Sequence, residues 1–134
     1  MSMLSIAWTV DSVTMDDVRV QLRGVAVVVV PSPPRFRLTK RQDPVDERVR
    51  DIVTEQLHAT VRTMKASDII VHRKQLIDEV FAGSRPEVAK VGARLSEINP
   101  QAVDFDEKSE FYRQLKLAQA RVTQQNLANR RNPS

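Results

Sequence analysis

The chain has 134 residues, which is enough for one domain with a single modest core. It contains no cysteine, so disulfides, thiolate nucleophiles and zinc–thiolate sites are excluded, and a cytoplasmic location is allowed. Aromatic residues make up only 4% of the chain, so the core must be mainly aliphatic, and a net charge of +4 suits an anionic partner. No apolar run reaches the ~18 residues that would cross a membrane, so we expect no transmembrane segment.

The first third of the chain predicts β-strands. Residues 18–23 alternate between apolar and polar, which indicates a half-buried strand, and a strand over residues 4–10 can pair with it across a turn at Asp16 and Asp17. Residues 25–30 are all apolar, which indicates a strand covered on both faces. We place a β-bulge at Gly24, between the two segments.

The middle of the chain predicts helices. Apolar residues recur at helical spacing from Val45 to Met64. We expect Ser67 to cap a second helix that runs towards Gly83, and Pro86 to begin one further short helix. Gly92 is then expected to end that helix in a left-handed conformation.

The last third predicts one strand and one long helix. Residues 94–98 alternate as in a strand, which we expect to end at Pro100. A helix should begin at Asp106 or Ser109 and run to about Arg130. Four of its apolar residues follow the spacing of a coiled-coil seam slightly longer than two heptads. We consider two alternatives for this stripe, self-association and packing back onto the domain: Phe111, Leu115, Ala118 and Val122.

Basic residues form two groups, one in the segment after residues 31–34 and one along the last helix. The plain interpretation is a solvated face. The sharper one is contact with an anionic surface, where each cation near lipid headgroups contributes about 1 kcal/mol, or with nucleic-acid phosphate. The candidate contact residues are those of the first group: Arg35, Arg37, Lys40 and Arg41.

We find no pattern for a catalytic, cofactor-binding or metal site. The only histidines, His58 and His72, have no ligand partners at a metal-binding spacing. Three glycines are too few for a phosphate-binding loop, and turns or helix N-termini account for the acidic clusters. We therefore expect no enzyme, no cofactor and no small-molecule substrate.

Several segments in combination resemble the SPFH, or band-seven, domain family of stomatins, prohibitins, flotillins and HflK/HflC. Residues 13–20 look like the family's Thr-x-Asp-Gly-Val turn, with Asp17 where glycine is common, which predicts a wider turn. Residues 25–30 look like its valine-rich strand, and residues 52–70 like its helix and following step. The resemblance covers about residues 13–120 and is closest to flotillin-like proteins.

The resemblance implies an α+β fold in which a small antiparallel-type sheet packs against two or three helices. We expect this SPFH-like domain, N-terminally reduced, at residues 1–104, and a C-terminal helix with a short coiled-coil stub and a frayed polar tail at residues 105–134. The implied function is a non-catalytic scaffold, cytoplasmic and peripheral to a membrane, which oligomerises and organises microdomains or partner proteins.

The expected partners are a second copy of the chain or a longer SPFH-family chain, together with an anionic membrane surface. The alternative is a small basic nucleic-acid-binding module. The basic groups carry almost no interleaved aromatic residues, which argues against that alternative.

Overall fold

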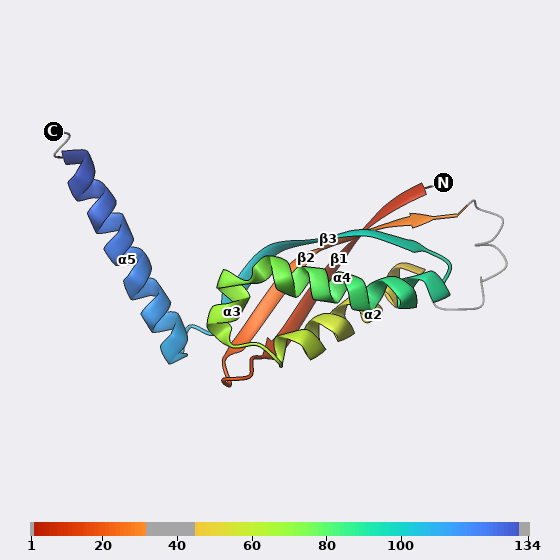
Figure 1. Cartoon of the computed structure of the whole chain (residues 1–134), viewed down its shortest axis with the longest axis horizontal. Coiled ribbons are helices and arrows are strands. Elements are labelled where there is room, and N and C mark those ends of the chain that lie inside the picture. Colours follow the sequence, from red (N-terminus) through yellow and green to blue (C-terminus); the bar gives the residue numbers. More distant parts are fainter. Residues whose placement is uncertain (1, 32–44, 132–134) are drawn as a thin grey trace.

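The computed structural model describes residues 2–31 and 45–131 as one α+β unit with an extended last helix (Figure 1). The three strands form one antiparallel sheet in the order β1-β2-β3. This confirms the predicted fold class. The elements follow each other as β1 (Ser2–Val13), β2 (Arg19–Val30), α2 (Val45–Val61), α3 (Ala66–Val71), α4 (Arg73–Lys90), β3 (Arg94–Phe105) and α5 (Glu110–Arg131).

The core lies between one face of the sheet and the helices α2 and α4, which run side by side across it (Figure 1). In β1 every second residue from Ile6 to Ser12 is buried, as the period of a strand requires, whereas two register shifts interrupt this alternation in β3. In each helix, buried residues recur at every fourth position. Fully burying one such aliphatic side chain stabilises the fold by about 1.5–3 kcal/mol. The two helical stripes are Val49, Val53, Leu57 and Val61 in α2, and Leu76, Val80, Ser84 and Val88 in α4.

The outer face of β2 differs from the expectation. The structure has one continuous strand here, and no described helix packs on the face that carries Val25, Val27 and Val29; Val27 is buried on this face, whereas Val25 and Val29 are partly exposed. The expectation of a strand covered on both faces was therefore wrong. A valine run satisfies the preference of β-branched residues for strands, and that preference does not depend on whether one face or both are covered.

A change of register occurs at Gly24, as predicted. Arg23 pairs with Ala102 while Gly24 pairs with Pro100, so β3 holds the extra residue of the irregularity. A Cβ atom on Gly24 would lie 2.5 Å from Cζ2 of Trp8, and closer still to the carbonyl oxygen of Asn99. Gly24 thus lets the buried indole and the β3 backbone approach each other.

The strand β3 runs through Pro100 to Phe105, so the expectation that the proline ends the strand was wrong. Because β3 lies at an edge of the sheet, a residue without an N–H group is tolerated there.

The helices also depart from the predicted boundaries. The N-cap residue of α3 is Lys65, and Ser67 lies inside that helix. The helix α4 continues through Gly83 and Pro86, so no new helix begins at the proline. Proline removes one backbone hydrogen bond from a helix. The packing of the buried side chains of α4 stabilises the helix by more than the loss of that bond destabilises it. Gly92 has a φ of +88°, which confirms the left-handed end.

The β1–β2 turn is tight and is attached to the connection between α2 and α3. Asp17 has a φ of 62° and its N–H donates to the carbonyl oxygen of Thr14 at 3.0 Å, which closes the turn; that the turn is wider than the family's glycine-containing one stays a prediction. Aspartate tolerates this left-handed conformation better than most residues do. The carboxylate of Asp16 accepts hydrogen bonds from the Thr14 hydroxyl and, at 3.0 Å, from the N–H of Ala66, at the start of α3.

Candidate interaction surface

The start of α5 is fixed to the end of the sheet by a chain of hydrogen bonds. The N–H of Asp106 donates to the carbonyl oxygen of Arg19 in β2 at 3.0 Å. The Ser109 hydroxyl accepts a 3.0 Å hydrogen bond from the N–H of Tyr112 and donates one of 2.7 Å to the carbonyl oxygen of Asp106. Ser109 is therefore the N-cap, one of the two starts that the sequence predicted.

The structure divides the predicted apolar stripe of α5 into two halves. Phe111 and Leu115 are partly buried against the core, and the Phe111 ring meets the Phe105 ring edge-on with centroids 4.8 Å apart. Ala118 and Val122 are exposed, the latter by 56%, because the helix has by then left the body (Figure 1). Packing back onto the domain thus holds for the first two residues, and the other two are free for a partner.

The structure shows a second exposed apolar feature of α5, at Leu117, which the sequence pattern did not predict. Leu117 is 54% exposed and lines a shallow hollow with Tyr112, Lys116 and two charged neighbours. The Lys116 ammonium lies 5.3 Å from the centre of the Tyr112 ring, in the range of a cation–π contact. Leu117 falls outside the heptad positions, so the coiled-coil pattern gave no signal for it.

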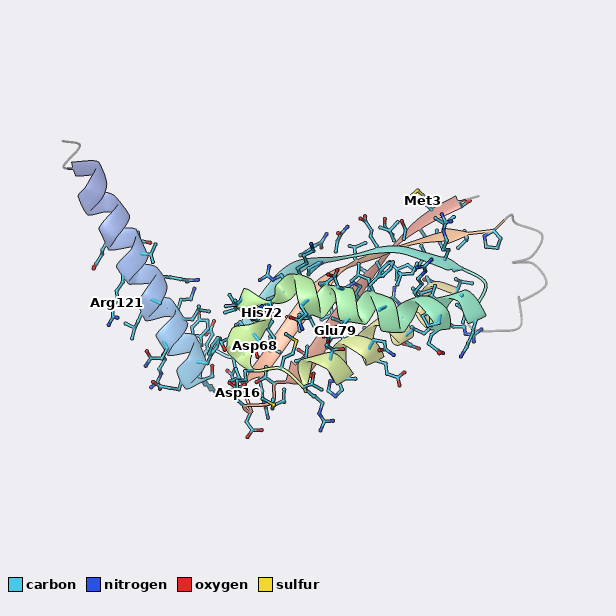
Figure 2. The ribbon with its side chains drawn as sticks, viewed as in Figure 1. Met3, Asp16, Asp68, His72, Glu79 and Arg121 are labelled. Atoms are coloured by element: carbon cyan, nitrogen blue, oxygen red, sulfur yellow. The ribbon has the colours of Figure 1, made fainter. Side chains whose placement is uncertain are left out.

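The net charge of the chain is concentrated on α5. This helix contains five basic residues and one acidic residue, so it accounts for the whole charge of +4, and the remainder of the chain is balanced. Arg121 is one of these cations, and Figure 2 shows it on the part of the helix that has left the body. The helix therefore presents a positive field to any surface that it approaches.

The remaining candidate residues are not brought together. His58 and His72 are both exposed, and within residues 2–31 and 45–131 no group of histidine and acidic side chains could hold a metal ion. Asp16 has a structural role in the turn. In Figure 2, it and Asp68 lie at the end of the body that is nearest to α5.

The predicted anionic contact residues lie outside the residues that the structure describes: Arg35, Arg37, Lys40 and Arg41. Of the helices that are described, none combines the length and the apolar character needed to span a bilayer.

Two comparisons with known proteins address the family of this chain. The family model of the SPFH domain / Band 7 family matches residues 2–132, which extends the resemblance beyond the 13–120 range expected from the motifs. A search of curated proteins gives no match. With nearly the whole chain covered, the strand turn, the paired helices and the final strand and helix all fall inside the match, and the chain belongs to the SPFH domain / Band 7 family.

Proposed function

We propose that this chain is a non-catalytic scaffold that acts by self-association at a membrane surface. Its family is consistent with membrane-associated scaffolds and is generally non-catalytic. Organisation of membrane microdomains or of partner proteins, as in flotillin-like proteins, is the role that we assign to the assembly.

The observation that supports self-association is the unpartnered outer half of α5. Ala118 and Val122 continue the stripe on which Phe111 and Leu115 pack against the body, yet they face solvent. Isolated helices are marginal in water, and most helical stability in proteins comes from packing of an apolar face. Two α5 helices side by side would bury these residues in a short coiled-coil seam. A longer chain of the same family could occupy the same seam.

The test is a measurement of mass by light scattering over a range of protein concentrations. We expect the wild-type chain to form oligomers and Val122→Asp to be monomeric, since the new charge would be buried in the seam. Thr123→Asp is the matched control, because Thr123 is also exposed but lies off the stripe. Leu115→Asp is less informative because Leu115 also packs on the core. A monomeric wild type at all concentrations would rule out self-association.

We further propose that anionic lipid headgroups bind the first basic group. The support is chemical, since clustered arginine and lysine side chains attract acidic lipids. The concentration of the net charge on α5 adds a second cationic region to the same chain. The residues assigned to lipid contact are Arg35, Arg37, Lys40 and Arg41.

A further inference from the structure

We infer that Arg50 blocks the addition of a further strand at the free edge of β1, because its side chain holds the carbonyl oxygen of Ala7 in the middle of that strand. Three observations carry the inference: the direction of the β1 backbone groups, the contrast between the two edges of the sheet, and the hydrogen bond from α2. The block itself does not depend on the seam on α5. Only its consequence rests on the proposed function, since a blocked edge leaves self-association to that seam.

The backbone of β1 has one side open for hydrogen bonds. The N–H of Thr14 donates to the carbonyl oxygen of Val18 at 2.9 Å, and the register of the hairpin is unbroken, so the even-numbered residues of β1 bond to β2. Hydrogen-bonded and non-bonded pairs alternate along an antiparallel ladder. The N–H and C=O groups of the odd-numbered residues therefore point to the free edge, where a further strand could bond to them.

The β1 edge lacks the protection that the β3 edge has. The strand β3 contains Pro100 and three charged residues, and two register shifts interrupt its pairing with β2. Such features hinder pairing at an edge. The strand β1 has 12 residues, no proline, no register shift and a single charged residue, Asp11. The Asp11 carboxylate accepts a 3.1 Å hydrogen bond from the Gln21 amide in β2, so it is directed towards β2 and not towards the free edge.

Arg50 supplies protection to this edge from the helix α2. Its side chain is half-buried, and its Nε donates to the carbonyl oxygen of Ala7 at 2.8 Å. A strand added to β1 would lie about 4.8 Å away from it. The guanidinium group therefore occupies the space that the N–H group of an added strand would need. Because Ala7 lies in the middle of β1, this obstacle interrupts pairing along the edge as a whole.

The same hydrogen bond also connects α2 to the sheet, so a purely structural role has to be separated from the block. Four fully buried side chains of α2 already hold the helix against the core: Val49, Val53, Leu57 and Val61. A single hydrogen bond contributes little beside the burial of four such side chains. We therefore expect Arg50→Ala to keep the fold and to open the edge.

The test is the mass of the folded protein, measured by light scattering over a range of concentrations. All variants carry Val122→Asp, which removes the seam on α5 from the comparison. Arg50→Ala should show a mean mass larger by about twofold or more than its control, because open strand edges pair with each other. Arg62→Ala is the matched control, since it removes another exposed cation at the end of α2.

A second substitution tests whether the new contact is at β1. The N–H of Thr9 points to the free edge, and proline is tolerated in an edge strand on that side. Adding Thr9→Pro to Arg50→Ala should therefore return the mass to that of the control. Amide hydrogen exchange gives an independent readout, because the N–H groups of Ser5, Ala7 and Thr9 should become protected in the associated Arg50→Ala variant alone.

Each contrary outcome overturns the inference. Equal masses for folded Arg50→Ala and Arg62→Ala would show that Arg50 blocks nothing. Association that persists with Thr9→Pro would place the contact elsewhere. Loss of folding in both Arg50→Ala and the milder Arg50→Gln would show that the bond is needed for the fold instead. Failure of the seam stays distinguishable, because a wild-type chain that Val122→Asp does not dissociate would alter the masses of the variant and its control alike.

Discussion

The carboxylate of Asp16 joins two parts of the fold that lie 50 residues apart in the sequence. Its hydrogen bond from the Thr14 hydroxyl is the main cause that holds the pKa of Asp16 below its usual value of 3.8, and the N–H of Ala66 lowers it further. A carboxyl whose pKa is lowered by folding stabilises the fold in its ionised form. That stabilisation is present above the usual pKa and is lost as the pH falls through the lower, folded value.

We therefore expect Asp16→Asn to reduce the free energy of unfolding at pH 7 by about 1 kcal/mol or less, because an exposed carboxylate is screened by solvent. The difference from wild type should shrink as the pH falls below 3.8 and disappear once the pH is below the lowered pKa of the folded state, where the carboxyl is neutral in both states. Urea unfolding at several pH values measures both the difference in the free energy of unfolding at pH 7 and its loss at low pH. Asp78→Asn, on the exposed side of α4, is the control. A difference that stays constant with pH would show that the charge of Asp16 has no part in it.

The glycines Gly24 and Gly92 are required for different physical reasons, and their alanine variants should differ. Gly24→Ala forces a Cβ into the Trp8 ring and the β3 backbone, so we expect a loss of about 2–3 kcal/mol from overpacking. Gly92→Ala meets no atom within 4 Å but must keep a φ of +88°, which costs about 1–2 kcal/mol. The urea midpoints of the two variants show which one loses more stability. A larger loss of stability in Gly92→Ala than in Gly24→Ala would contradict the steric explanation for Gly24.

At the level of elements, α4 shows how packing can override a local break. Pro86 cannot donate a hydrogen bond to the carbonyl oxygen of Ala82, although the helix continues to Lys90. The residues that hold the helix in place lie on the opposite, buried stripe, with Val80 and Val88 fully buried on either side of the proline.

Restoring the lost hydrogen bond should stabilise the protein. We expect Pro86→Ala to raise the free energy of unfolding by about 1 kcal/mol, less than the ~3 kcal/mol intrinsic difference because the surrounding helix already accommodates the ring. Thermal and urea unfolding measure the change, with Arg85→Ala as a neighbouring exposed control. A decrease in stability would mean that the proline ring itself contributes to packing.

For the whole molecule, the charge distribution separates a balanced body from a cationic helix. Residues outside α5 carry equal numbers of acidic and basic side chains, so attraction to an anionic surface must come from local groups and from α5. Interactions between exposed charges are screened over about 10 Å at 0.1 M salt. Membrane contact by this route should therefore depend steeply on ionic strength.

Co-sedimentation with phosphatidylcholine vesicles, with and without phosphatidylserine, measures this dependence. We expect binding only with phosphatidylserine, and a fall of about tenfold or more between roughly 50 mM and 500 mM salt. Replacing the four cations of the first basic group by alanine should weaken binding more than Arg113→Ala and Arg121→Ala together. Binding that is equal on both vesicle types would point to insertion of apolar side chains instead.

The sequence determined a large part of this fold because much of it follows from local periodicity and turn chemistry. The alternation of β1 and β2, the apolar stripes of α2 and α4, the left-handed Gly92 and the Ser109 cap each depend on a few neighbouring residues. The apolar stripe of α5 was predicted in the same way. The SPFH resemblance then placed these elements in one order, which the family match supports.

Only the tertiary structure decided which of these surfaces are occupied. Phe111 is anchored because the Phe105 ring lies beside it, while Val122 is free because the helix has left the body by that point. The exposure of Val25 and Val29 on the outer face of β2 and the continuity of α4 through Pro86 are likewise settled by neighbours far away in sequence. Burial and edge position depend on such long-range contacts, whereas periodicity reports only which side chains share a face.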